Sequence, residues 1–385
     1  MMKIDQPWIA AAPTRAVCDT MTFGGAEIYF VGGCVRNALL NVAVSDLDLA
    51  TSLLPQEVVE RAERAGLKAV PTGIDHGTVT VVSGGIAHEI TTFRKDIATD
   101  GRRAVVAFAQ SITEDARRRD FTMNALYARP TGEVVDPIGG LTDLQARKVR
   151  FIGEARNRIR EDYLRILRYF RFHSWYGDPE AGFDPEALAA IADTLDGLEQ
   201  ISRERVGAEI IKLLAAPDPA PSVAAMRQLG VLRHVLPGAD DRALAPLVHL
   251  EGGMEPQAEL RLAALGGENL RDQLRLSRAM AARVDLLRDL AVGTGPAAEL
   301  AYRHGSEVAR WAMILRAALL ETPLSPNLET EISTGSASHF PVVAKDLMPE
   351  LSGPELGQAL KALETQWIAS GFVLTREDLL SSFRA

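Results

Sequence analysis

The chain has 385 residues, of which 47% are hydrophobic and 24% are charged, and its formal net charge is −9. This composition is ordinary for a folded chain of two or three domains, and it excludes a protein that is mainly disordered. No apolar stretch approaches the ~20 residues that a membrane-spanning helix needs, and the start lacks a basic segment followed by an apolar run, so we expect a cytoplasmic protein without membrane contact.

Five short apolar or β-branched runs near the N-terminus predict a small mixed sheet with helices. The last two runs flank Ser83-Gly-Gly85, which predicts a hairpin with a glycine turn. Between the second and third runs, Pro55 to Ala65 has proline at a first helical position and apolar residues at helical spacing. The five runs are Ile28–Val31, Leu47–Ala50, Lys68–Val70, Thr78–Val82 and Ile86–Thr92.

From about Phe151 the pattern changes to leucine, alanine and arginine at helical period, interrupted by breaks rich in proline and glycine. No alternating strand pattern recurs there, and the segments between the breaks have ordinary helix lengths. We therefore expect the second half of the chain to be all helical.

Basic residues are concentrated in one segment of an otherwise acidic chain. Between Arg94 and Arg171 there are 17 Lys and Arg against 11 Asp and Glu, a net of +6, which leaves −15 for the remainder. The overall charge argues weakly against a nucleic-acid partner, because phosphate binding relies on Lys and Arg. The concentration of positive charge in one segment reverses that argument and favours a nucleic-acid partner.

Asp46 and Asp48 give the strongest single indication of chemistry. Carboxylates two apart on a strand project to the same face, where they are costly unless they hold a cation. Magnesium is the natural choice, because it takes hard oxygen ligands and leaves positions for water and a substrate phosphate. Glu89, on a strand that could pair beside them, is a possible third carboxylate. Two solvated turn aspartates are the alternative interpretation.

Two further segments favour phosphate binding. Gly32 and Gly33 stand at the end of a strand, where paired glycines let backbone N–H groups approach a phosphate, and Arg36 could supply a guanidinium fork. The arginines Arg117 to Arg119 could neutralise a triphosphate, while Asp120 and Asn124 could orient an arginine or a ribose hydroxyl. The alternatives are a glycine pair that only turns the chain and a charged helix face.

A helix is expected to carry Asp162, Arg165, Arg168 and Arg171 at successive i, i+3 positions. Exposed intrahelical ion pairs are one interpretation of this spacing. The other is base recognition, because cytosine and adenine both present an amino donor next to a ring-nitrogen acceptor. A carboxylate and a guanidinium would accept these two bases and reject uracil and guanine.

In order and spacing, these motifs resemble the class II tRNA nucleotidyltransferase and bacterial poly(A) polymerase family of the polymerase β superfamily. The resemblance covers about residues 28 to 236. The matching stretches are Gly32–Arg36, Ser45–Ala50, Glu89–Arg94, Arg118–Ala125, Asp136–Gly140, Glu161–Arg168 and Ile201–Leu214.

The resemblance implies an α/β nucleotidyltransferase head followed by an all-α neck, body and tail. With it we expect an N-terminal extension over 1–25, the catalytic head over 26–150, a neck over 151–236 that recognises the base and binds RNA, and a body and tail over 237–385 that bind tRNA. Residues 95–110 would form the family's flexible loop. Asn37 stands where the family usually has aspartate, which puts any role of that carboxylate in doubt.

The resemblance also implies roles for individual residues. Asp46 and Asp48 would bind catalytic Mg²⁺, Asp162 and Arg165 would read the incoming CTP or ATP, and the remaining candidates would bind other parts of the nucleotide. The nucleotide-binding candidates are Gly33, Arg36, Arg119, Asn124, Asp162, Arg165, Arg168 and Arg171.

The implied function is template-independent addition or repair of the CCA end of tRNA, with CTP and ATP as substrates and pyrophosphate as product. A poly(A) polymerase or an enzyme that adds only A is the main alternative, and an inactive RNA-binding relative is a third. The acidic chain has no long basic tail, which favours the tRNA enzyme, because a polymerase moving along unstructured RNA profits from extended basic surface. No protein partner is evident.

Overall fold

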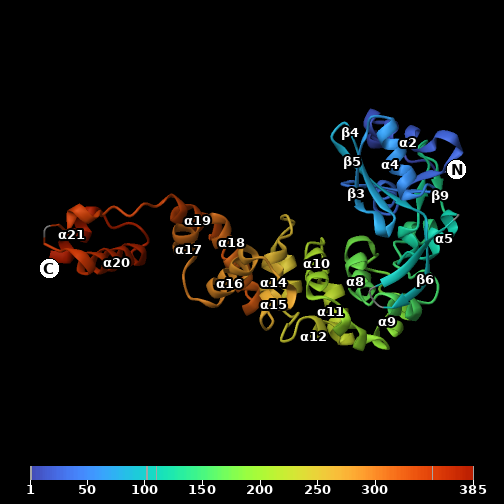
Figure 1. The fold of residues 1–385 in the computed structure, drawn as a ribbon. Helices are drawn as coiled ribbons and strands as arrows, with labels where there is room; N and C mark the ends of the chain where they lie inside the picture. The colour runs from blue at the N-terminus through green and yellow to red at the C-terminus, as the bar shows by residue number, and fades with distance from the viewer. Residues whose placement is uncertain (1, 101–102, 110, 349, 385) are drawn as a thin grey trace. The chain divides into compact units, whose positions relative to one another are not determined.

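The structure is a computed structural model that describes residues 2–100, 103–109, 111–348 and 350–384. The chain divides into two compact units, Met1–Val235 and Leu236–Ala385 (Figure 1). Within the described residues, no helix combines the length and the apolar character needed to cross a membrane.

The first unit is built on a seven-stranded sheet in the order β3-β4-β5-β2-β1-β8-β9. β2 and β5 are parallel and the other neighbours are antiparallel, so the mixed sheet with helices that we expected is confirmed. All five expected runs form strands, and the two-residue strands β8 and β9 were not predicted. The strands are β1 (Ile28–Val31), β2 (Leu47–Thr51), β3 (Lys68–Gly73), β4 (Thr78–Ser83), β5 (Ile86–Thr92), β8 (Tyr127–Ala128) and β9 (Val134–Val135).

The expected hairpin joins β4 to β5, and the glycines at 84 and 85 both have positive φ, as tight hairpin turns require. Along β4, buried and half-buried residues alternate. Two helices, α2 (Ala12–Thr22) and α4 (Pro55–Arg64), pack against this part of the sheet (Figure 1). The helix expected over Pro55 to Ala65 is thereby confirmed.

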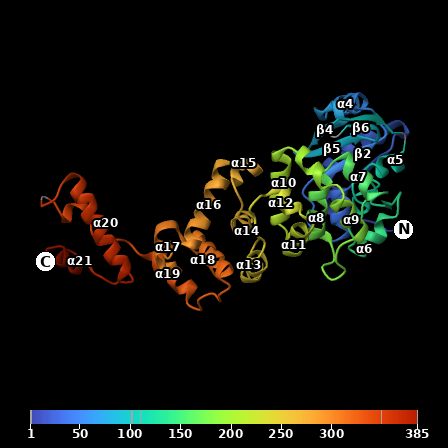
Figure 2. The ribbon, with the colours of Figure 1, turned by 90° about the horizontal axis from the view of Figure 1, so that it is seen from below.

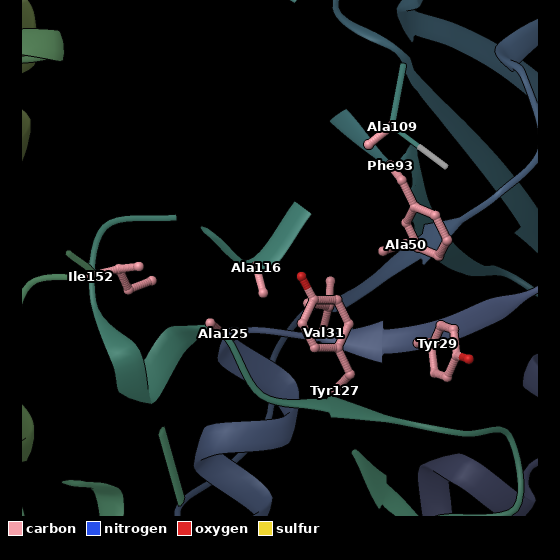
Figure 3. Packing of buried hydrophobic residues seen from close by; sticks show 9 residues of the cluster. All are labelled: Tyr29, Val31, Ala50, Phe93, Ala109, Ala116, Ala125, Tyr127 and Ile152. Atoms are coloured by element: carbon pink, nitrogen blue, oxygen red, sulfur yellow. The ribbon is translucent and has the colours of Figure 1, made fainter. Parts of the chain in front are cut away.

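β1 lies between β2 and β8, and all four of its residues are buried, so both of its faces are covered. Tyr29 and Val31 point into a cluster with Phe93 and Tyr127 on one face (Figure 3). Phe30, on the other face, contacts the Trp8 ring edge-on at 4.9 Å between centroids. The end of β1 is thus held firmly, and the glycine pair of the candidate site follows directly.

The remaining helices of the first unit follow or flank the sheet, and α8 and α10 lie side by side (Figures 1 and 2). α8 is buried on several sides, with Tyr169 and Phe172 in an aromatic cluster that includes Phe121 and Phe151. The helices are α1 (Pro7–Ala10), α3 (Gly33–Leu39), α5 (Ile112–Arg117), α6 (Gly140–Gln145), α7 (Ala155–Glu161), α8 (Leu164–Tyr176), α9 (Pro185–Ala192), α10 (Arg203–Leu214), α11 (Ala220–Leu229) and α12 (Val231–Val235), with 3₁₀ turns η1 (Phe23–Gly25), η2 (Ile74–His76), η3 (Thr122–Asn124) and η4 (Leu195–Gln200).

The segment expected as a loop over 95–110 contains regular structure. β6 (Arg94–Asp100) and β7 (Arg103–Phe108) form a separate two-stranded antiparallel sheet with a register shift between Asp96 and Ala98. Residues 101, 102 and 110 of the expected loop lie outside the described residues.

The described part of the second unit is helical, as expected for this half of the chain. One small hydrophobic cluster is formed by α17, α18 and α19 and another by the C-terminal helices. The elements are α13 (Leu244–Leu250), α14 (Ala258–Leu265), α15 (Leu270–Leu274), α16 (Arg278–Val292), α17 (Ala297–His304), α18 (Ser306–Leu320), α19 (Leu328–Ala337), the 3₁₀ turn η5 (Ala344–Asp346), α20 (Gly353–Ala369) and α21 (Arg376–Arg384).

Two helical glycines in this unit predict opposite effects on stability. A Cβ at Gly335 would lie 1.9 Å from the backbone oxygen of Ala298, whereas a Cβ at Gly357 would meet nothing within 4 Å. We expect Gly335→Ala to lower the free energy of unfolding by about 1–3 kcal/mol, because α17 and α19 must separate. Gly357→Ala should raise it by about 0.5–1 kcal/mol. Urea denaturation of the full chain measures both, and equal effects would contradict the close packing at Gly335.

Candidate active site

The candidate carboxylates lie at one end of the parallel pair β2 and β5. Asp48 is directly opposite Glu89 in the register, while Asp46 is exposed and immediately precedes β2. Burial raises the pKa of Asp48, and the nearby Glu89 raises it further. The local excess of negative charge is the environment that a cation would neutralise.

A metal ion would find two suitable donors here, Asp46 and Asp48. Among the described residues, no group of three or more His, Cys, Asp or Glu side chains is arranged to hold a metal ion. Glu89 lies opposite Asp48 in the register, and its role as a possible third carboxylate stays a prediction. Hard oxygen donors with open positions fit a divalent cation that completes its shell with water and substrate oxygens.

The turn at Gly32 and Gly33 brings two arginines to the end of β1. Gly32 has φ 70° and ψ −118°, a conformation that suits glycine. A Cβ there would lie 3.4 Å from Nη1 of Arg119, and a Cβ at Gly33 would lie 3.8 Å from Nη2 of Arg36. Cys34 Sγ lies 3.7 Å from the backbone oxygen of Asp48, so this turn adjoins the carboxylate strand.

Arg119 is oriented by Asp115, which sequence reasoning did not single out. Its Nη2 and Nε donate to Asp115 Oδ2 at 3.0 and 3.2 Å, and Tyr127 donates its hydroxyl to the same oxygen at 2.7 Å. Burial alone would raise the pKa of Asp115, but Arg119 and Arg118 outweigh burial and lower it to about 2. The i, i+4 spacing of Asp115 and Arg119 in the sequence is the signal that could have identified the pair.

Asp120 joins the sheet region to α8. Its Oδ2 accepts a hydrogen bond from Nε of Arg168 at 2.8 Å, and its Oδ1 accepts from Nδ2 of Asn124 at 3.0 Å. The Oδ1 of Asn124 in turn accepts from Arg36. Burial alone would raise the pKa of Asp120, but Arg168 and the hydrogen bonds lower it to about 2. One buried chain of contacts thus connects Arg36 and Asn124 with Arg168.

This chain continues to α10 through Glu209, a second residue that the motifs did not indicate. Nε of Arg171 donates to Glu209 Oε2 at 2.6 Å, and Arg168 lies 3.9 Å from the other carboxylate oxygen. Glu209 is 6% exposed, so its charge requires these partners. No local pattern in the sequence relates Glu209 to α8.

The structure corrects the expected placement of Asp162. α8 begins at Leu164, and Asp162 precedes it in an extended conformation, so the four charged residues do not form one ridge on a single helix. The Oδ1 of Asp162 accepts from the backbone N–H of Leu164 at 3.1 Å, which is the local bonding that favours aspartate before a helix.

The backbone N–H of Arg165 donates to the carbonyl oxygen of Asp162 at 3.0 Å, but the side chains of the two residues have separate ion-pair partners. Asp162 pairs with Arg205 of α10 at 2.7 Å. Arg165 pairs with Glu161 and donates to the backbone oxygen of Arg158 at 2.8 Å. Arg168 and Arg171, which do lie on α8, belong to the network of Asp120 and Glu209.

A cavity of about 510 Å³ lies elsewhere in this unit, lined by Arg117, Arg150 and Arg158 together with Phe151 and Asp184. Of the arginines that could neutralise a triphosphate, Arg117 lines this cavity, whereas Arg36, Arg119 and the candidate metal-binding carboxylates do not. The candidate site is therefore the region around the Gly32–Gly33 turn and the carboxylate strand rather than this cavity.

The shifted pKa of Asp120 predicts how its contribution to stability depends on pH. Its folded-state pKa of about 2 is below the unfolded value of about 3.9, so the stabilisation is present above pH ~4 and is lost as the pH falls toward 2. We expect Asp120→Asn to lower the free energy of unfolding by about 2–4 kcal/mol at pH 7, and the difference from wild type to shrink between pH 4 and 2.

Urea titrations at a series of pH values measure this difference. Asp193→Asn is the matched control, because Asp193 forms an exposed pair with Arg156, and its effect should stay below about 1 kcal/mol at every pH. A difference for Asp120→Asn that is unchanged from pH 7 to 2 would show that the ionised carboxylate is not the stabilising form.

Two family models match the chain. The model described as "Poly A polymerase head domain" matches residues 28–150, and the one described as "Probable RNA and SrmB- binding site of polymerase A" matches residues 182–242. The first match contains the candidate carboxylates and the glycine turn, and the second contains α9 to α12.

Curated relatives and solved structures extend the similarity to nearly the whole chain. The human protein named "CCA tRNA nucleotidyltransferase 1, mitochondrial" is 34% identical over 92% of this chain and 86% of its own. The crystal structure of the Bacillus stearothermophilus CCA-adding enzyme in complex with CTP is 28% identical, covers 99% of this chain and 98% of its own, and has a TM-score of 0.76. The "CCA-adding enzyme" of Lactobacillus delbrueckii subsp. bulgaricus is 34% identical, with 100% of this chain and 99% of the relative covered. With its mixed-sheet head and this match along its whole length, the chain belongs to the CCA-adding tRNA nucleotidyltransferase family.

Proposed function

We propose that the protein adds or repairs the 3′-terminal CCA of tRNA from CTP and ATP without a nucleic-acid template. Support comes from the full-length relatives named CCA-adding enzymes and from the related structure in complex with CTP. The observation that carries the proposal is that Asp48, with Asp46 nearby, lies beside the Gly32–Gly33 turn, where Arg36 and Arg119 are also found.

In the proposed reaction, the 3′-hydroxyl of tRNA attacks the α-phosphorus of the bound nucleotide and pyrophosphate leaves. Arg36 and Arg119 would bind the triphosphate, and Asp115 and Tyr127 would keep Arg119 oriented toward it. Asn124, Arg168 and Arg171 belong to the network behind this site and would support the nucleotide from η3 and α8.

Members of nucleotidyltransferase families use a divalent metal, and we propose that here it is Mg²⁺ held by Asp46 and Asp48. When bound, the cation would favour ionisation of the attacking hydroxyl and neutralise the entering and leaving oxygens. Glu89 would act beside the site by adding to its negative charge.

The domain organisation expected from the sequence stands as part of the proposal. The extension over 1–25, the head over 26–150, the neck over 151–236 and the body and tail over 237–385 are supported by the family match over 28–150 and the unit boundary after Val235. A cytoplasmic location also stays a prediction, since some relatives are named as mitochondrial proteins, and fractionation of the source cells would test it.

The reaction is tested with three tRNA substrates, whose 3′ ends lie before CCA, after the first C and after CC. Each tRNA is incubated with each labelled nucleotide singly and then with CTP and ATP together. We expect wild type to stop after CCA, and EDTA to abolish incorporation until Mg²⁺ is restored. Open-ended A tails would instead indicate a poly(A) polymerase, and A added only after CC an A-adding enzyme. No incorporation would favour an RNA-binding protein without activity.

In the same assay, Asp46→Asn should lower the rate at least ~100-fold, because one of the two metal-binding carboxylates is lost. Asp46 is exposed, so the fold should be unaffected and the melting temperature unchanged. Asp19→Asn, an exposed carboxylate on α2, serves as the matched control and should retain wild-type activity. An active Asp46→Asn protein would contradict the proposed metal site.

We further propose that Asp162 and Arg165 read the base, which requires them to exchange their present partners Arg205 and Glu161 for the nucleotide. Asn at position 162 can present a donor as well as an acceptor, so Asp162→Asn should raise incorporation of UTP relative to CTP by about tenfold or more. Asp193→Asn is again the control. Wild-type discrimination in Asp162→Asn would argue against a role of this carboxylate in base selection.

A further inference from the structure

Arg36 is a buried cation with an unusual set of partners. Its side chain lies within the first unit, and the residue is 6% exposed. Nε and Nη2 donate to the Oδ1 of Asn37 at 3.1 and 2.8 Å, Nη1 donates to Asn124, and Nη2 also donates to the hydroxyl of Tyr176 at 2.8 Å. Each of these acceptors is neutral.

The other site arginines are paired with carboxylates. Arg119 contacts Asp115, Arg165 contacts Glu161, Arg168 contacts Asp120 and Arg171 contacts Glu209. No carboxylate in the part of the chain that the structure describes forms an ion pair with Arg36. Burial lowers the pKa of Arg36, which reflects the cost of holding its charge away from water.

Two aromatic rings complete the surroundings of the guanidinium. The ring centroid of Tyr176 lies 3.9 Å from Cζ of Arg36, and that of Phe172 lies 5.1 Å away. Aromatic faces attract a cation without cancelling its charge. Tyr176 therefore both stacks on the guanidinium and accepts a hydrogen bond from it.

The orientation of the Asn37 amide is fixed as well. Its Nδ2 donates to the backbone oxygen of Ala43 at 2.9 Å, so its Oδ1 faces Arg36. Asn37 thus places Arg36 as a carboxylate would, through Nε and Nη2, but supplies no negative charge.

We propose that Asn37 and Tyr176 are positioning residues that hold Arg36 with its charge unpaired, so that this charge binds a phosphate group of the incoming nucleotide. Arg36 Nη2 lies next to Gly33 at the turn that adjoins the Asp48 strand, which places the charge at the proposed triphosphate site. The inference rests on the proposed function for the identity of the ligand. The neutrality of residue 37 then sets the affinity for the triphosphate.

The variants Asn37→Asp and Asn37→Ala distinguish the effect of the charge of Arg36 from the effect of its hydrogen bonds to residue 37. Aspartate keeps an acceptor at Arg36 but neutralises it, whereas alanine removes the acceptor and leaves the charge. Using pyrophosphate as the probe in calorimetric titrations with Mg²⁺ present, we expect affinity to fall about tenfold in Asn37→Asp and only two- to threefold in Asn37→Ala. Tyr176→Phe, which keeps the ring and loses the hydroxyl, should also cost about two- to threefold.

The effect should be confined to the phosphates. KM for CTP should rise in Asn37→Asp in proportion to the loss of pyrophosphate affinity, kcat should change less than about twofold, and binding of cytidine should be unchanged. Asn37→Asp gains an ion pair with Arg36 but loses the hydrogen bond from Nδ2 to the Ala43 carbonyl, so these effects oppose each other and we expect a melting temperature close to that of wild type.

A purely structural role of Asn37 predicts that Asn37→Ala loses more pyrophosphate affinity than Asn37→Asp. That order would overturn the inference. Wild-type pyrophosphate affinity in Asn37→Asp would also overturn it. A wild-type protein that binds pyrophosphate but does not extend tRNA would refute the proposed function alone, whereas absence of pyrophosphate binding in wild type would refute both.

Discussion

The ion pair between Asp120 and Arg168 connects the proposed head to α8 of the proposed neck, and both carry residues of the candidate site. A carboxylate that is 8% exposed is costly to bury in its charged form unless its oxygens are satisfied. Here four N–H groups serve Asp120, from the backbone of Phe121, from Asn124 and twice from Arg168. Because Asp120 lies two residues before the short turn η3 and Arg168 lies in the middle of α8, the pair fixes the helix against the sheet region.

Other side chains of the site are held in place through contacts with this ion pair. Asn124 donates a hydrogen bond to Asp120 and accepts one from Arg36. The position of α8 is therefore linked to the glycine turn through the side chains of Asp120 and Asn124. Glu209 extends the same set of contacts to α10. Asp120 and Glu209 each have at least one guanidinium partner. These buried charges therefore stabilise one arrangement of the η3 region, α8 and α10, and they disfavour arrangements in which a buried charge would have no partner.

Local patterns were enough to predict the five longer strands of the sheet, because these carry apolar or β-branched residues, but not the two-residue strands β8 and β9. Local patterns did not predict that Asp162 lies outside α8, because an i, i+3 spacing in the sequence is the same whether a helix begins at the aspartate or two residues after it. The bond from Asp162 to the N–H of Leu164 decides between these possibilities. Glu209 could not be predicted at all, because its partners lie 38 and 41 positions earlier in the sequence and meet it only after α8 and α10 pack together.

The partners of Arg36 have a consequence for how the site responds to acidity. An amide does not titrate, and a guanidinium stays charged at any physiological pH. The local charge supplied by Arg36 is therefore the same in mildly acidic and mildly alkaline surroundings. Any variation of catalysis with pH over that range must arise from groups other than this arginine and the Asn37 amide, such as the substrate hydroxyl or the phosphates themselves.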